Sequence, residues 1–145
     1  MSAAPDAWLP ACTEAMEEML ETMFFETLVD RPSLEQDVPS NAIWVSVDFQ
    51  GAISGRVSVA VSPPVAGHLL VNFLGREEDE PASAAEQVMV TSELANVLCG
   101  CMLSRVDPEN RLEIAAPQWS EGAVPAVPCI AFPLENGNIF VTLEA

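Results

Sequence analysis

Two short stretches rich in valine and isoleucine, residues 43–49 and 53–61, constrain the fold of this chain most strongly. In both, apolar and polar side chains alternate with a period of two, which is typical of a β-strand with one buried face. Residues 50–52, which include a glycine, separate them and favour a tight turn. We therefore predict an antiparallel hairpin, with Arg56 on the solvent face of its second strand.

An apolar pattern of longer period precedes this hairpin. Over residues 11–28, methionine, leucine and phenylalanine side chains alternate with glutamates at the 3.6-residue spacing of an amphipathic helix. The pattern predicts a first helix over this range, and its methionine stripe is more typical of a buried face than of a pliable binding surface. Residues 30–41 contain two prolines and several polar residues, and we interpret them as a connector.

A short helix is predicted directly after the hairpin. Pro63 and Pro64 are typical of a helix start because their fixed backbone angle suits the first turn. We expect this helix over residues 65–73, ending near Gly75. It carries His68, the only histidine of the chain. Because no second histidine lies nearby, a metal-binding or acid–base role for His68 is not favoured.

A longer helix follows an acidic loop at residues 76–81. Ser83 and Glu86 have the spacing of a capping box, in which each side chain accepts a hydrogen bond from the other residue's backbone N–H. This spacing predicts that a helix covers residues 84–105.

Three strands are predicted after the long helix, at residues 112–116, 126–133 and 138–144, the last two joined around residues 135–137. The element order is therefore α-β-β-α-α-β-β-β. Strands outnumber helical crossovers, which favours an α+β fold with helices packed on a largely antiparallel sheet. The length and the hydrophobic content of 50% suit one domain over residues 1–145.

The charge of the chain restricts its partners. It carries 22 acidic residues and five arginines, without lysine, for a formal net charge of −17. Such a surface repels nucleic-acid phosphates and anionic lipid, so we expect neither nucleic-acid nor membrane binding. A partner with a cation or a basic patch is favoured instead.

The N-terminus has no basic segment typical of a signal peptide, and no apolar run reaches the roughly 18 residues that span a bilayer. We therefore predict a cytoplasmic protein.

The four cysteines, Cys12, Cys99, Cys101 and Cys129, are scattered along the chain. Cys99 and Cys101 point in different directions on a helix, so they cannot readily share a metal ion or a disulfide. We interpret all four as small buried apolar residues and predict no metal site.

The candidate site lies on the long helix. Glu93 and Asn96 are three residues apart and therefore share one face, with Gly100 one turn beyond them and Met89 on the same stripe. Asparagine and glycine are weak helix formers, and an interior glycine costs roughly 1 kcal/mol relative to alanine. We infer that a function other than local stability explains them. The opposite stripe is expected to pack on the sheet and consists of Val88, Thr91, Leu94, Ala95, Leu98 and Met102.

The chemistry of this pair suggests positioning rather than covalent catalysis, because neither a Ser/His nor a Cys/His arrangement accompanies it. The amide of Asn96 can donate a hydrogen bond to a water and accept one from it, and so orient that water for attack on a phosphoryl group. The carboxylate of Glu93 can pair with a lysine or arginine of a partner. As a bare motif, however, Glu-x-x-Asn is more often a solvated helix face.

The whole pattern resembles the CheC, FliY and CheX phosphatases, which act on the phosphorylated chemotaxis response regulator CheY, and is closest to the CheX-like branch. The resemblance rests on the first amphipathic helix ending in residues 20–25, the hairpin, the short helix, the long helix with Glu93, Asn96 and Gly100, and the terminal strands. It implies a phosphatase for the aspartyl phosphate of a CheY-like receiver in a chemotaxis or other two-component pathway.

The resemblance also implies roles for single residues. Asn96 would position the attacking water and Glu93 would contact the regulator, so that both are candidate catalytic residues. Glu93, Met89 and Gly100 would together form the partner-binding surface. The chain itself would bind no cofactor, since Mg²⁺ is carried by the receiver. The resemblance further implies one site per chain and a homodimer built through sheet edges.

Met89 departs from the family pattern, which has Asp or Ser four residues before the glutamate. A methionine cannot form the hydrogen bonds of either residue. The alternative hypothesis is therefore a catalytically degenerate CheX-like binding or scaffold module of the same pathways. An interaction domain for an unrelated basic partner is a third hypothesis.

Overall fold

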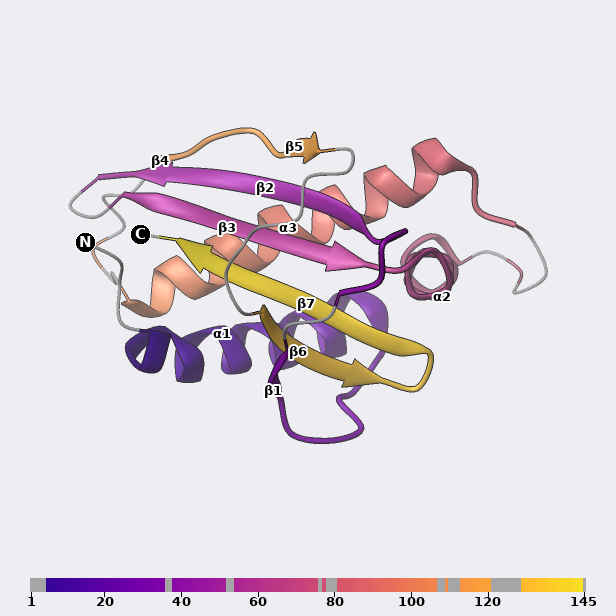
Figure 1. Ribbon diagram of the computed structural model, residues 1–145, viewed down its shortest axis with the longest axis horizontal. Coiled ribbons are helices and arrows are strands. Elements are labelled where there is room, and N and C mark those ends of the chain that lie inside the picture. Colours follow the sequence, from indigo (N-terminus) through magenta and orange to yellow (C-terminus); the bar gives the residue numbers. More distant parts are fainter. Residues whose placement is uncertain are drawn as a thin grey trace.

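Three helices pack on an antiparallel sheet in the part of the chain that the structure describes (Figure 1). This computed structural model describes residues 5–35, 38–51, 54–75, 77, 81–106, 109, 113–120 and 129–144. The predicted α+β class is thereby confirmed. No helix among these residues is long and apolar enough to cross a bilayer.

The sheet has the strand order β1-β6-β7-β3-β2-β4, and β5 also pairs with β2. All of its pairings are antiparallel. Its strands are β1 (Ser33–Glu35), β2 (Ile43–Gln50), β3 (Gly55–Val61), β4 (Glu113–Ile114), β5 (Gln118–Ser120), β6 (Cys129–Leu134) and β7 (Gly137–Glu144).

The predicted hairpin is confirmed as β2 and β3, in which Ile43 lies opposite Val61 and Phe49 opposite Gly55. Ile53, where the second strand was expected to begin, lies outside the described residues. Arg56 is exposed, as predicted, and its Nε donates to Asp48 Oδ1 across the hairpin at 2.7 Å. This pairing fixes the register on the solvent face as the valines fix it on the buried face.

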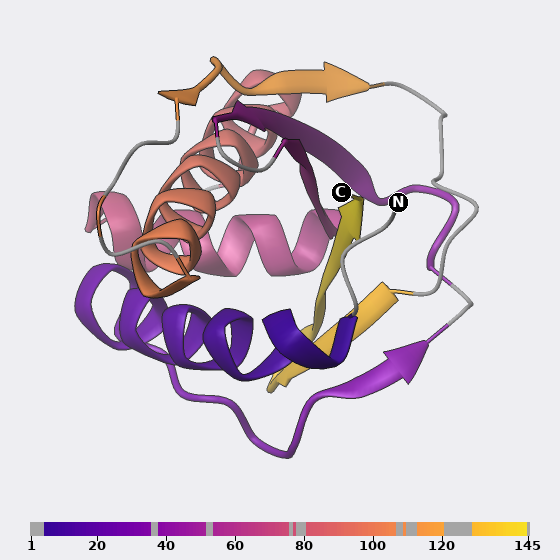
Figure 2. The same ribbon diagram turned by 90° about the vertical axis from the view of Figure 1, so that its left-hand side faces the viewer.

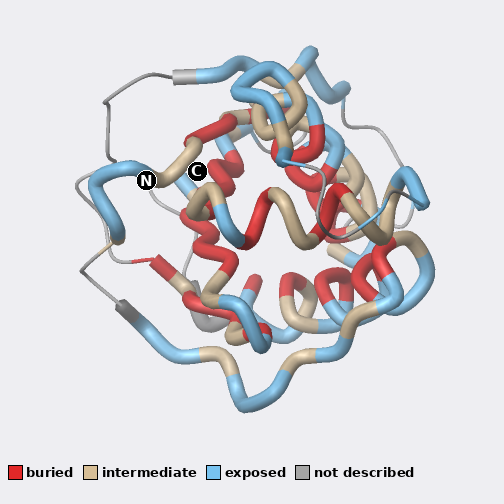
Figure 3. Tube along the Cα trace, turned by 90° about the vertical axis from the view of Figure 1, so that its right-hand side faces the viewer, coloured by how far each residue is buried: buried red, intermediate tan, exposed pale blue. Residues whose placement is uncertain are grey.

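Alternation along β2 divides the sheet into two faces. Val45, Val47 and Phe49 lie in the core beneath the helices. Trp44 points to the other face, where it belongs to a second buried cluster with Ala60, Cys129, Ala131 and Phe140. Buried segments therefore occur along the strands as well as along the inner sides of the helices (Figure 3).

The first helix differs from its prediction at both ends. α1 spans Pro5–Met19 and continues as a π-helical turn, η1, over Leu20–Phe24. Phe25 then adopts a left-handed conformation with φ 55°, and its N–H donates to the carbonyl of Leu20. This closure ends the helix before residue 28. The start was missed because Pro10, which lies inside α1, is normally a helix-breaking signal.

Parts of the strand prediction were also wrong. Residues 30–41, predicted to be a connector, include β1, in which Leu34 pairs with Ile130 of β6. The strand predicted over residues 112–116 ends earlier, since β4 stops at Ile114, while residue 112 lies outside the described part; β5 was not predicted at all. β6 and β7 match the last two predicted strands closely, although residues 126–128 lie outside the described part. A strand of two or three residues is too short to show a period of two.

The other two helices match their predictions closely. α2 spans Pro63–Leu74 and ends at Gly75, whose φ of 68° is left-handed. α3 spans Ala84–Val106. The capping box is present: the N–H of Glu86 donates to Ser83 Oγ at 3.1 Å, and the N–H of Ser83 donates to Glu86 Oε1 at 3.0 Å.

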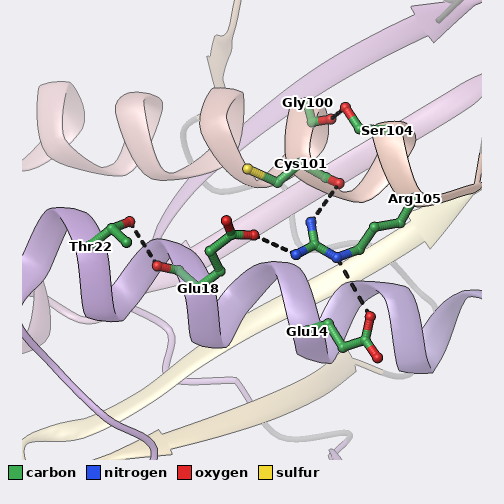
Figure 4. A network of polar contacts seen from close by, with 7 residues as sticks. All are labelled: Glu14, Glu18, Thr22, Gly100, Cys101, Ser104 and Arg105. Carbon is green, nitrogen blue, oxygen red and sulfur yellow. Dashed lines mark hydrogen bonds and ion pairs between the residues drawn. The ribbon is translucent and has the colours of Figure 1, made fainter. Parts of the chain in front are cut away.

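An arginine at the end of α3 links that helix to α1 (Figure 4). Arg105 Nη2 donates to the carboxylate of Glu18, and Nε lies 3.6 Å from Glu14 Oε2. Nη1 also donates to the carbonyl of Cys101 at 3.1 Å. Exposed ion pairs contribute about 0.2–1 kcal/mol each, whereas full burial of one leucine or methionine contributes about 1.5–3 kcal/mol. Arg105 therefore orients two helices that apolar burial holds together.

The turn between β6 and β7 generates a stability prediction. Gly137 has φ 141°, and a Cβ there would lie 2.9 Å from Val65 Cγ2. We expect Gly137→Ala to lower the free energy of unfolding by about 1–3 kcal/mol, because the new side chain is strained and meets a β-branched residue of α2. Urea unfolding would measure this loss. Gly100→Ala is the control, since its Cβ would meet only Ile114 Cδ1 at 3.8 Å. Equal stability of Gly137→Ala and the wild type would contradict the argument.

Candidate functional site

The outer face of α3 carries the candidate site. Glu93 and Asn96 are exposed, Met89 is 37% exposed and Gly100 is half-buried. On the opposite side of the helix, all but one of the residues predicted to pack on the sheet are buried; the exception, Val88, is partly buried. The buried ones are Thr91, Leu94, Ala95, Leu98 and Met102. The predicted division of this helix into two faces is therefore confirmed, while the roles of the outer residues stay predictions.

Local hydrogen bonds explain why other polar residues of α3 do not join the site. Thr91 Oγ1 donates to the carbonyl of Gln87 at 2.7 Å, and Ser92 Oγ donates to that of Val88 at 2.8 Å. Such hydroxyls bond back to the preceding turn of their own helix. Ser92, although next to Glu93, is thus engaged with the backbone and does not replace the acidic or hydroxyl residue absent at Met89.

Glu93 and Asn96 are free of such engagement. Neither forms a hydrogen bond or an ion pair with any residue among those described. An amide and a carboxylate on adjacent turns therefore face solvent with their bonding capacity unused. This arrangement can bind a partner's cation and one oriented water, and it requires no movement of the core.

Gly100 has a neighbour that the sequence did not reveal. The side chain of Ile114, on β4, lies beside it, since a Cβ on Gly100 would be 3.8 Å from Ile114 Cδ1. The space expected for a partner above Gly100 is thus bordered by the chain's own edge strand. β5, with the exposed Trp119, also contacts α3. Ile114 lies within the strand predicted over residues 112–116, although its position beside Gly100 was not predicted, and no periodic signal marked Trp119, whose strand has only three residues.

His68 lies in a different place, on α2. Its Nε2 is hydrogen-bonded to Glu26 Oε1, which also accepts a hydrogen bond from Asn72 Nδ2 at 3.2 Å. His68 lines a surface groove of about 460 Å³. The other described residues that line it are Pro64, Gly67, Val71, Pro81, Ala82 and Asn136. None of them belongs to the Glu93 stripe, so His68 and the candidate site are separate features.

Burial keeps the cysteine thiols of this chain unreactive. Cys12, Cys99 and Cys129 are buried, as predicted, and Cys101 is only partly so. Burial raises the pKa of both Cys12 and Cys99 to about 12, so at neutral pH these thiols stay protonated. The thiolate is the form that attacks electrophiles and binds metals. Within the described ranges, no group of three or more histidine, cysteine or acidic side chains has a geometry that could hold a metal ion.

Solved structures define the class of this fold. The chain is similar to the chemotaxis protein CheX from Vibrio vulnificus, with a TM-score of 0.74 and 17% identity over 99% of each chain. It is similar to CheX in the CheX–CheY–BeF₃–Mg²⁺ complex from Borrelia burgdorferi, with a TM-score of 0.71 and 15% identity over 94% of this chain and 96% of that one. Thermotoga maritima FliY gives a TM-score of 0.65 and 11% identity over 100% and 93% of the chains.

The fold is therefore that of the CheX- and FliY-type chemotaxis proteins. More specifically, the family described as Chemotaxis phosphatase CheX matches residues 43–131, which include the whole of α3, and the chain belongs to this family. None of the curated proteins matches the chain. The resemblance drawn from the element order and the Glu93/Asn96 helix is thereby confirmed at the level of family and fold.

Proposed function

We propose that this protein dephosphorylates the aspartyl phosphate of a CheY-like response regulator. The observation that carries the proposal is the exposed, unengaged pair Glu93 and Asn96 on α3 of a chain that belongs to a chemotaxis phosphatase family. A solved CheX–CheY complex from Borrelia burgdorferi supports the choice of partner. The proposal places the protein in the cytoplasm with its receiver.

In this mechanism Asn96 positions a water. Its amide accepts a hydrogen bond from the water and donates one to it or to a phosphoryl oxygen, which aligns the water for attack on phosphorus opposite the aspartyl oxygen. Placing a nucleophile in this way lowers the barrier through orientation, without a covalent intermediate on the enzyme. Mg²⁺, held by the receiver, would neutralise charge on the phosphoryl oxygens.

Glu93 acts one turn away as the docking residue. Its carboxylate pairs with a lysine or arginine of the receiver and thereby fixes the register in which Asn96 meets the phosphoryl group. The excess of acidic residues in the chain favours the same kind of partner, since it accelerates encounter with a basic surface.

A second candidate function has its own observation. Met89 occupies the position one turn before Glu93 and is 37% exposed, but its thioether is at most a weak hydrogen-bond acceptor. If that position must bond to the receiver for turnover, the protein is a binding or scaffold module that retains the docking surface alone.

The first functional prediction concerns Asn96. We expect Asn96→Ala to slow dephosphorylation of the receiver by about 100-fold or more, because the attacking water loses its alignment. The decay of phosphorylated receiver with wild-type and variant protein measures this. Because Asn96 is exposed, its variant should keep its stability within about 0.5 kcal/mol, which urea unfolding checks. Equal decay rates with both proteins, at the uncatalysed level, would refute the enzymatic proposal.

Met89 distinguishes the two candidate functions. We expect Met89→Asp to raise the dephosphorylation rate severalfold over the wild type, since a carboxylate there restores the hydrogen bond that the family pattern provides. Met89→Leu, of similar size and without that capacity, should leave the rate unchanged. A wild type that binds the receiver without turnover, together with an active Met89→Asp variant, would establish the scaffold function.

Self-association is a separate proposal. We infer from the family resemblance that the protein forms a homodimer through sheet edges. A net charge of −17 on each copy opposes this association, and salt screens the repulsion, with a Debye length of about 8 Å at 0.15 M. The dimer fraction measured by light scattering should therefore rise between low and physiological salt. A monomer at every salt concentration would exclude the dimer.

A further inference from the structure

Two edge strands place apolar side chains on the α3 side of the sheet. Ile114 of β4 lies opposite Phe49, and Trp119 of β5 lies opposite Val45. Residues directly opposite each other in an antiparallel pair project from the same face. Phe49 and Val45 are in the core beneath the helices. Ile114 and Trp119 therefore project toward α3 from the edge of the sheet, along which both strands run (Figures 1 and 2).

Both side chains lie alongside the Glu93 face. Ile114 Cδ1 is beside Gly100, 3.8 Å from where a Cβ would stand. From Phe49 back to Val45, β2 covers about 13 Å, which corresponds to roughly nine residues of a helix that runs in the same direction. Because α3 runs in the same general direction as β2 (Figure 1), Trp119 is displaced from Ile114 toward the N-terminal part of α3, the direction in which Asn96 and Glu93 follow Gly100. The contact between β5 and α3 agrees with this position.

The exposure of Trp119 sets it apart from the other two tryptophans of the chain. Trp119 is 53% exposed and Ile114 39%, while the other two tryptophans, Trp8 and Trp44, are 7% and 3% exposed. Tryptophan is enriched among the residues that dominate the binding energy of protein interfaces. We refer to Trp119 and Ile114, the two apolar side chains that project toward α3 from this edge of the sheet, as the apolar ridge.

The charges beside this ridge indicate which kind of partner protein would bind to it. Glu93 is exposed beside it, and the chain as a whole carries a formal net charge of −17. An apolar centre beside an acidic side chain, on a strongly acidic protein, is complementary to a surface with an apolar centre and basic residues around it.

We propose that Trp119 and Ile114 are the specificity-determining contacts for the phosphorylated receiver. The receiver docks its apolar surface on this ridge, Glu93 pairs with one of its cations, and Asn96 reaches the phosphoryl group. This inference rests on the proposed function and assigns partner selection to β4 and β5, whereas the chemistry belongs to α3.

The kinetic test uses Trp119→Ala and Ile114→Ala with phosphorylated CheY-like receiver from the same organism. We expect KM to rise about 10- to 100-fold for Trp119→Ala and less for Ile114→Ala, with kcat within twofold of the wild type in both. Leu9→Ala is the matched control, because Leu9 is 37% exposed, close to the value for Ile114, but belongs to α1, which lies across the molecule from β4 and β5 (Figure 2). An unchanged KM in both ridge variants, with Asn96-dependent activity intact, would overturn this inference alone.

Fluorescence gives a readout independent of turnover. Because Trp119 is the one exposed tryptophan of the three, acrylamide should quench mainly its emission, and receiver activated with beryllium fluoride and Mg²⁺ should protect it. Trp119→Phe should abolish this protection. Protection that depends on the concentration of this protein alone would show that a second copy covers the ridge and would overturn the proposal. Absence of receiver binding by calorimetry would refute both this inference and the proposed function.

Discussion

Burial of one face of α3 against the sheet is the constraint on which the rest of this structure depends. Leu94, Leu98 and Met102 lie fully or almost fully buried in the shared core, with β2 beneath them. Each such side chain contributes about 1.5–3 kcal/mol on burial, far more than the exposed pairs of Arg105. The rotation of α3 about its axis is therefore set by its apolar stripe. Once that rotation is fixed, Glu93 and Asn96 can only face outward.

In α3, the residues that stabilise the fold and the residues proposed to carry the function therefore lie on opposite faces. The functional pair is exposed and forms no hydrogen bond or ion pair with the described residues, and a Cβ on Gly100 would meet only Ile114 Cδ1 at 3.8 Å. A weak helix former at Asn96 and at Gly100 lowers helix stability by up to about 1 kcal/mol each, which the long buried stripe readily offsets. Selection could thus vary the outer face, including Met89, without changing the fold.

The sequence predicted the elements that have enough residues to show a period. The β2–β3 hairpin, α3 with its Ser83/Glu86 capping box, and the two faces of that helix were all correct. The end of α1 was not, because a π-helical turn and the left-handed Phe25 depend on local closure rather than on pattern. The edge strands β1 and β5 were missed because they form where a neighbouring strand offers free backbone groups, which no short sequence segment reveals, whereas β4 lies within the strand predicted over residues 112–116.

The contrast between long periodic elements and short edge strands also explains which site residues could be predicted from the sequence. Glu93 and Asn96 were found because both lie on one helix, where a spacing of three residues places them together. Trp119 is more than twenty residues away along the chain and reaches α3 only through its pairing with Val45. The residues for a chemical step can therefore lie on one element and be read from spacing. Residues that select a partner gather from several elements, and their juxtaposition appears only when the sheet is assembled.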